Sequence, residues 1–188
     1  KAGLRDVGAL VAQARTRPGE MAYGAGGGLA NLAGVLFQHA AGIRTMEVPY
    51  KGAAPAMTDL LGGQITYIFT STTAALPSVK SGKLVALGVT TRKRWPTLPE
   101  IPTVAQAGVA GFEASTWYGA LAPAGTPAVV VSKLQSDFAA MLNAADTRKS
   151  LLDLGFGVIA GTPAELAEVI RNDLARWGKL MKALAQKQ

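Results

Sequence analysis

Residues 21–40 read MAYGAGGGLANLAGVLFQHA, and this stretch decides the fold class. A short apolar segment ends at Tyr23, a run of glycines follows, and residues 29–40 then keep apolar side chains at helical spacing. Gly42 would end that helix, and residues 45–48 have the composition of a strand. The order strand, helix, strand is the unit from which parallel α/β sheets are built.

The same alternation continues on both sides of this unit. We predict further strands at 65–69 and 84–89, and helices at 7–16, 54–61, 72–81, 103–107, 127–142 and 163–185. The segment from Phe112 to Leu121 is expected to be extended. Such an order predicts an α/β fold with a largely parallel sheet, rather than a helical bundle or a barrel of hairpins.

Composition excludes several classes of site. The 188 residues contain no Cys and one His, so thiolate nucleophiles, Cys-ligated zinc, disulfides and sites with two imidazoles are ruled out. The net charge is +7, but its densest group, Arg92-Lys93-Arg94, is interpreted as a solvated loop because no nucleic-acid-binding motif accompanies it. We expect no catalytic residue, metal ion, cofactor or nucleic-acid partner.

The glycine run Gly24-Ala25-Gly26-Gly27-Gly28 predicts an anion site. It lies between a strand and a helix, where unhindered backbone N–H groups and the positive end of the helix dipole meet. Tyr23 immediately precedes the run and belongs to the same candidate site. The alternative is a tight turn that lets helix and strand pack closely.

A second candidate follows the predicted strand 65–69. Thr70, Ser71, Thr72 and Thr73 would place hydroxyl and N–H groups at the carboxyl end of a parallel strand, where open α/β sheets bind ligands. A helix cap by Ser71 or Thr72 alone is the alternative. Trp117 and Tyr118 could line the same site, or they could simply pack in the core.

A dinucleotide fingerprint does not fit the glycine run. The position for its third glycine is held by Leu29 or Asn31, and no Gly-Lys-Ser/Thr follows. A nucleotide-dependent enzyme of doubly wound fold and a fragment that acts as an interaction module are the alternatives to a small-anion receptor.

Several motifs carry a family resemblance. They are Val48-Pro49-Tyr50-Lys51-Gly52, Asp59-Leu60-Leu61-Gly62-Gly63-Gln64, Lys80-Ser81-Gly82-Lys83-Leu84, Leu98-Pro99-Glu100-Ile101-Pro102-Thr103, Trp117-Tyr118-Gly119 and Ala122-Pro123-Ala124-Gly125-Thr126-Pro127. In this order they resemble the extracytoplasmic solute receptors of tripartite tricarboxylate transporters, also called Bug or TctC-type binding proteins.

The resemblance implies a periplasmic binding protein of the type II kind that is not an enzyme. It would close two lobes on a small organic carboxylate, hold it mainly through backbone N–H groups and waters, and deliver it to the membrane components of a transporter. The glycine run occupies the place of the family's ligand loop, although it is about two residues shorter and has no hydroxyl. No signal peptide is recognisable in the chain.

The resemblance also implies a division into lobes. Residues 1–113 would form the second, ligand-binding lobe with a doubly wound sheet, and residues 114–188 the crossover and the C-terminal part of the first lobe. The first strands of that first lobe would be absent from the chain. We therefore expect uncovered apolar surface and unpaired strand edges in the C-terminal part, and hence a homo-oligomer or a rearrangement there.

Overall fold

Two compact units make up the structure, a computed structural model that describes residues 3–185, without the side chains of 179–181 and 183–185. The chain divides between Thr116 and Trp117. Residues up to Thr116 form unit 1 and the residues from Trp117 onward form unit 2. This division lies close to the predicted one at residues 113 and 114, and the assignment of the units to receptor lobes stays a prediction.

Unit 1 is an α/β unit built on a small parallel sheet. Its elements are α1 (Val7–Thr16), β1 (Ala22–Ala25), α2 (Leu29–Ala41), β2 (Met46–Pro49), α3 (Ala53–Gly62), β3 (Tyr67–Ile68) and α4 (Thr72–Lys80). The strand order is β2-β1-β3, and Tyr23 of the central strand pairs with Glu47 on one side and Tyr67 on the other. The predicted α/β fold with a parallel sheet is confirmed.

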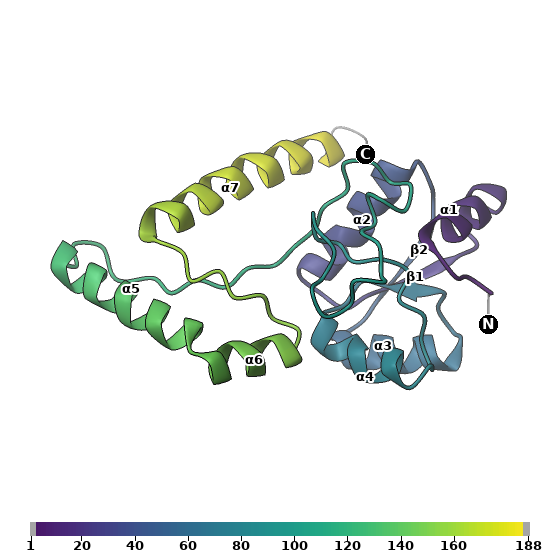
Figure 1. The fold of residues 1–188 in the computed structure, drawn as a ribbon. Coiled ribbons are helices and arrows are strands. Elements are labelled where there is room, and N and C mark those ends of the chain that lie inside the picture. Colours follow the sequence, from purple (N-terminus) through teal and green to yellow (C-terminus); the bar gives the residue numbers. More distant parts are fainter. Residues whose placement is uncertain (1–2, 186–188) are drawn as a thin grey trace. The chain divides into compact units, whose positions relative to one another are not determined.

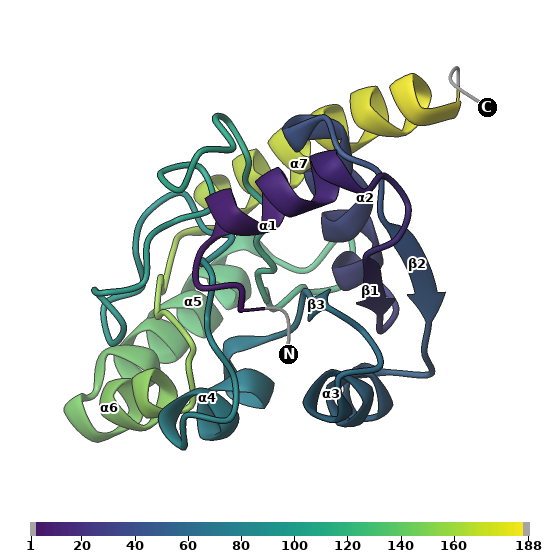
Figure 2. The same cartoon turned by 90° about the vertical axis from the view of Figure 1, so that its right-hand side faces the viewer.

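Helices cover both faces of this sheet. Figures 1 and 2 show α1 and α2 on one side and α3 and α4 on the other. The core contains an aromatic cluster in which the Phe37 ring meets Tyr67 at 6.0 Å, Phe69 at 5.6 Å and Phe112 at 5.8 Å between centroids. Phe112 comes from a segment outside the sheet, so residues 104–114 help to close the core of unit 1.

Two predicted elements of unit 1 do not form. The predicted strand 84–89 has no neighbouring strand to pair with, and only Val89 forms an isolated bridge, with Thr103. The predicted helix 103–107 is a turn. The capping box that the spacing of Thr103 and Gln106 predicts is nevertheless present, because Thr103 N–H donates to Gln106 Oε1 at 3.2 Å and Gln106 N–H donates to Thr103 Oγ1 at 3.1 Å. These bonds satisfy a single turn and do not propagate a helix.

Unit 2 contains helices, of which the first two are separated by Ala144 alone, and extended chain joins the second to the third. They are α5 (Ala128–Asn143), α6 (Ala145–Asp153) and α7 (Pro163–Ala185), and α6 was not predicted. The spacing of Thr162 and Glu165 predicts a capping box at the start of α7, and the structure confirms it: Thr162 N–H donates to Glu165 Oε2 at 2.7 Å and Glu165 N–H donates to Thr162 Oγ1 at 3.3 Å. The sequence Gly125-Thr126-Pro127 predicts that Thr126 caps α5 and that Pro127 takes the first helical position. This prediction is wrong, because the Thr126 hydroxyl donates to Pro123 O at 2.8 Å and Pro127 is itself the N-cap residue.

None of the helices in the described range 3–185 combines the length and the apolar character needed to cross a membrane.

Candidate functional site

The candidate site lies at the carboxyl edge of the parallel sheet. Each strand there leads through a short loop into a helix: β1 into α2, β2 into α3 and β3 into α4. Because parallel strands end at the same edge of a sheet, the helices α2, α3 and α4 all begin at this edge. In the strand order β2-β1-β3, the second strand lies on one side of β1 and the third lies on the other, so the direction of the strand order changes at β1. Ligands of open α/β sheets bind at such a switch point.

The first two loops touch each other. Tyr50 N–H donates to Ala25 O at 2.8 Å, which holds the start of the β2–α3 loop against the end of β1. A β-carbon on Gly26 would lie 3.1 Å from Gly52 O and 3.3 Å from Ala53 N. The absence of a side chain at Gly26 therefore lets the N-terminus of α3 approach the glycine run closely.

The glycines of the run have two different roles. A β-carbon on Gly24 would lie 2.6 Å from Ile65 Cδ1 and 2.9 Å from Ile68 Cγ2, so Gly24, like Gly26, permits close packing. Gly27 and Gly28 have open space around them but adopt φ of 91° and 58°, which favours glycine. The alternative interpretation, that the glycines let helix and strand pack closely, thus applies to Gly24 and Gly26. Gly27 and Gly28 instead shape the turn that exposes the backbone amides.

One amide of the turn is occupied by the protein itself. Gly27 N–H donates to Asn31 Oδ1 at 2.7 Å. Neither α2 nor α3 has a side-chain cap, because both helices begin after a glycine, Gly28 and Gly52. Within residues 3–185, no acceptor is bound to the N–H groups of 28–30 or 53–54. Two helix starts with free amides therefore lie next to each other, and both favour negative charge.

The third helix start is different. Ser71 Oγ accepts from Ala74 N–H at 3.3 Å and lies 2.8 Å from Thr73 Oγ1, so Ser71 caps α4. Thr72 is half-buried in the first turn of that helix. The Thr70 hydroxyl oxygen is buried and has no hydrogen-bond partner in the described part of the chain. Ser71 therefore acts as the helix cap that the alternative interpretation predicts. The Thr70 hydroxyl remains able to form a hydrogen bond with a ligand.

Tyr23 lies in the core rather than at the edge of the sheet. Its side chain is fully buried, its ring stacks on Tyr67 with centroids 5.6 Å apart, and its hydroxyl donates to Glu47 Oε2 at 2.6 Å. Burial, followed by the bond to Glu47, raises the pKa of the Tyr23 phenol. Burial also raises the pKa of Tyr67 to about 12. Both phenols therefore stay protonated at neutral pH. The Tyr23 side chain comes from β1, and its ring packs against Gly34 of α2.

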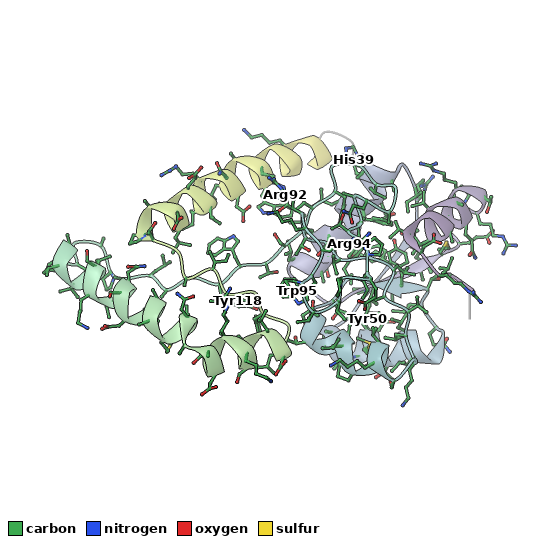
Figure 3. The ribbon with its side chains drawn as sticks, viewed as in Figure 1. His39, Tyr50, Arg92, Arg94, Trp95 and Tyr118 are labelled. Carbon is green, nitrogen blue, oxygen red and sulfur yellow. The ribbon has the colours of Figure 1, made fainter. Side chains whose placement is uncertain are left out.

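Trp117 and Tyr118 belong to unit 2. Trp117 Nε1–H donates to Asp173 Oδ2 at 2.6 Å, and the Tyr118 ring meets Phe156 edge-on with centroids 5.9 Å apart. The Tyr118 side chain is 82% exposed on the extended chain (Figure 3). The part these two residues play in ligand binding stays a prediction.

The loop from Tyr50 to Ala53 was not among the predicted site residues. The signal that could have found it is Gly52, which lies between a strand and a helix, as Gly28 does. No Ser, Thr, Asp or Asn stands in the first three positions of the helix that follows Gly52. Lys51 in this loop is exposed and has no hydrogen bond or ion pair with a described residue. It adds a positive charge beside the two free helix starts.

No resident metal is indicated at this edge. Residues 3–185 include no group of three His, Cys, Asp or Glu side chains that could hold an ion. His39 lies in the last turn of α2, at the end of the helix opposite Gly28 (Figure 3). In the basic loop, Arg92 pairs with Glu113 at 3.2 Å, and Arg94 donates to Gln106 Oε1 at 2.9 Å and Pro99 O at 2.8 Å. Both arginines thus order unit 1 itself.

Comparison with known proteins places this geometry in context. The family model "Tripartite tricarboxylate transporter family receptor" matches residues 2–186. The UPF0065 protein of the tcbD-tcbE intergenic region of Pseudomonas sp. strain P51 is 37% identical over 95% of this chain and 54% of its own length. The BugT protein of Bordetella pertussis is 32% identical over 100% of this chain and 58% of its own length.

Solved structures agree with the sequence relatives. Rpa4515 of R. palustris, solved with adipate, matches at a TM-score of 0.84 and 35% identity over 96% of this chain and 61% of its own. The periplasmic binding protein BugD matches at 0.80 and 32%, over 96% and 62%. MatC of Rhodopseudomonas palustris, with bound malate, matches at 0.76 and 26%, over 94% and 62%. The chain spans little more than half the length of the two curated relatives, the UPF0065 protein of Pseudomonas sp. strain P51 and BugT.

Proposed function

Because the chain belongs to the tripartite tricarboxylate transporter receptor family, we propose that it captures a small organic carboxylate as a solute-binding protein. The observation that carries the proposal is the pair of glycine-started helices, α2 and α3, whose free N–H groups meet at the switch point of the sheet. Neighbours solved with adipate and malate support the ligand class.

The chemistry of the edge suits binding rather than reaction. Carboxylate oxygens would accept from the amides of residues 28–30 and 53–54, with Thr70 Oγ1 as a further group and Lys51 as the neighbouring cation. Each helix dipole contributes about 0.3–1 kcal/mol at an exposed site, and bridging waters add contacts nearly as favourable as direct ones. The family and the solved neighbours are receptors, which argues against the nucleotide-dependent enzyme.

The wider role extends this proposal. Unit 1 would be the second lobe of the receptor, and unit 2 the crossover and C-terminal part of an incomplete first lobe. The location would be the periplasm, as the name of BugD states for that protein, and the cargo would pass to the membrane components of a tripartite transporter. Partial coverage of the relatives and the exposed apolar residues of unit 2 support these points, and we expect the chain alone to self-associate through unit 2.

The test uses a pair of isosteric charge changes on one helix. Asn31→Asp keeps the acceptor for Gly27 N–H but places a negative charge beside the free amides. Gln38→Glu makes the same change at the other end of α2, where Gln38 Oε1 accepts from Thr45 N–H at 2.7 Å. The readout is an NMR titration of the amides of residues 28–30 with adipate and with malate.

We expect saturable shifts at these amides in the parent chain, an affinity reduced about five-fold in Asn31→Asp, and little change in Gln38→Glu. An interaction between two charges at an exposed, solvent-screened position is worth up to about 1 kcal/mol, which corresponds to that factor. Equal affinities in all three proteins, or shifts confined to other parts of unit 1, would show that the carboxylate does not bind at this edge.

A further inference from the structure

Tyr50, which Figure 3 labels, forms two hydrogen bonds at the start of the loop that joins β2 to α3. Its N–H donates to Ala25 O at 2.8 Å, and its phenol donates to Asp59 Oδ2 at 2.7 Å. The first bond ties the loop to the end of β1. The second ties it to α3, because Asp59 is the seventh residue of that helix. One side chain and its own backbone therefore connect the central strand to the helix that offers free amides at 53–54.

The rest of this loop has little to hold it in place. Only Lys51 and Gly52 separate Tyr50 from the first residue of α3. Gly52 has φ of 108°, which favours glycine, and the Lys51 side chain is exposed. The N–H groups of 51 and 52 donate to no residue of the described part of the chain. The position of the loop thus depends on Tyr50 at one end and on α3 at the other.

Helix α3 packs on the sheet through its first turn. Ala56 is 2% exposed, and its Cβ lies 3.3 Å from the position that a β-carbon on Gly24 would take. Apolar contacts are non-directional, so this one sets the distance between α3 and β1 without fixing the rotation of the helix. The bond from Tyr50 to Asp59 is directional, and Asp59 lies three residues after Ala56 on the adjoining turn. Contact and bond together hold the start of α3 in one orientation.

The bond between Tyr50 and Asp59 is present at neutral pH. The hydrogen bond to Asp59, followed by burial, raises the pKa of the Tyr50 phenol, so the hydroxyl keeps its proton. Among the described residues, no Lys, Arg or His forms an ion pair with Asp59. A hydrogen bond to a carboxylate is also roughly twice as strong as one between neutral groups. The phenol is therefore the donor that fixes the Asp59 side chain.

We propose that Tyr50 is a positioning residue for carboxylate binding. Through Asp59 it holds the start of α3 in place, so that the amides of 53–54 meet the same ligand as the amides of 28–30. This inference rests on the proposed function and goes further, because it assigns the geometry of the site to a side chain that forms no bond with the ligand. Without the hydroxyl, the free chain holds the start of α3 correctly for only a fraction of the time, and the apparent affinity falls by that fraction.

The experiment removes one hydroxyl at a time from the 188-residue chain. Tyr50→Phe deletes the donor to Asp59. Tyr67→Phe is the matched control, because the Tyr67 hydroxyl lies 2.9 Å from Thr45 Oγ1, and Thr45 precedes β2 at the edge of the sheet opposite the candidate site. An NMR titration with adipate gives the affinity. Relaxation dispersion of the free chain reports microsecond-to-millisecond exchange at the amides of 53–54.

We expect Tyr50→Phe to bind adipate about five-fold more weakly than the parent chain, which corresponds to a start of α3 that is correctly placed about one-fifth of the time. The free variant should show exchange at the amides of 53–54, and saturation with adipate should remove it. Tyr67→Phe should lower the melting temperature, because it loses a hydrogen bond in the core. Its adipate affinity and its amides at 53–54 should stay at parental values.

Two substitutions of Asp59 separate a positioning role from a structural one. Asp59→Asn keeps a side-chain oxygen that accepts from the phenol, and it should retain most of the parental affinity. Asp59→Leu has a similar size but no acceptor, and it should match Tyr50→Phe. The double variant Tyr50→Phe with Asp59→Leu should bind adipate as each single variant does, because both changes remove the same bond.

Different results would overturn the inference and the proposed function. Parental affinity and no exchange at 53–54 in Tyr50→Phe would overturn the inference, as would an equal loss of affinity in Tyr67→Phe, which would show a general effect of lower stability. Adipate-dependent shifts at 28–30 without shifts at 53–54 in the parent chain would overturn the inference and leave the proposed function standing. The absence of saturable shifts at both places would overturn the two together.

Discussion

The ring of Tyr23 fills the space that a β-carbon on Gly34 would need, with Tyr23 Cε2 only 2.2 Å from the position of that atom. Helix α2 therefore lies directly on the phenol of the central strand. The contact sets the distance between α2 and the sheet, and with it the position of the free amides at Gly28.

Gly34→Ala should destabilise unit 1. The added methyl overlaps the ring, and overpacking of this kind costs about 1–3 kcal/mol, only partly offset by the roughly 1 kcal/mol by which Ala favours a helix over Gly. Urea unfolding measures the change in free energy. Gly62→Ala is the control, because its nearest atom is Gln64 Cγ at 3.9 Å, and it should raise stability. Equal effects of the two substitutions would show that α2 is free to move away from Tyr23.

Thr70→Val should change stability and binding in opposite directions. The Thr70 hydroxyl is buried without a partner, and its removal relieves an unsatisfied group that costs about 1–3 kcal/mol. The free protein should therefore melt at a higher temperature, while adipate binding weakens. Thr103→Val should instead lower stability, because Thr103 is 1% exposed and its hydroxyl accepts from Gln106 N–H. Unchanged adipate binding by Thr70→Val would remove Thr70 from the site.

Lys51→Met should reduce selectivity for dianions. Lys51 lies between Tyr50, whose N–H bonds Ala25 O, and Gly52, which lies against Gly26. Its charge should favour a second carboxylate by about 1 kcal/mol or less, because the side chain is exposed. Titration with adipate and with hexanoate, which have equal carbon chains, should show a larger loss for adipate. An equal loss for both acids would contradict selection by charge; Lys83→Met is the exposed control.

Glu165 should titrate below its ordinary pKa of 4.5. The backbone N–H of Thr162, and then its hydroxyl, donate to the carboxylate and lower the pKa. A lowered pKa in the folded state means that this support for the start of α7 is complete above pH 4.5 and is lost as the pH falls through the lower value. An NMR pH titration measures the midpoint. Thr162→Ala should raise it part of the way back, since the backbone donor remains; a midpoint above 4.5 in the parent chain would contradict the bond.

The elements of unit 1 up to residue 80 were predictable because local signals and packing agree there. Apolar periodicity marks α2, and Gly42 ends it with φ of 61°, as the glycine signal predicts. The predicted strand 84–89 failed because a strand exists only through a pairing partner, which an apolar run does not specify. Helix α6 has a mostly polar composition and was missed for that reason.

The site was predictable in place but not in detail. The sequence indicates that glycines and hydroxyls follow parallel strands, and this locates the edge. It does not show that Asn31 takes the Gly27 amide, that Gly24 is needed for packing against Ile65, or that Tyr23 turns into the core. Those outcomes depend on residues far apart in the chain, as does the approach of Gly52 to Gly26.

Helices α2 and α3 start at glycines and so offer their own first turns no side-chain oxygen. A ligand whose oxygens accept from these amides would cap both helices, so ligand binding and stiffening of this edge of unit 1 would occur together. A protein that contacts this edge would then distinguish the ligand-bound form from the free form by the rigidity of the two helix starts, before any larger movement takes place.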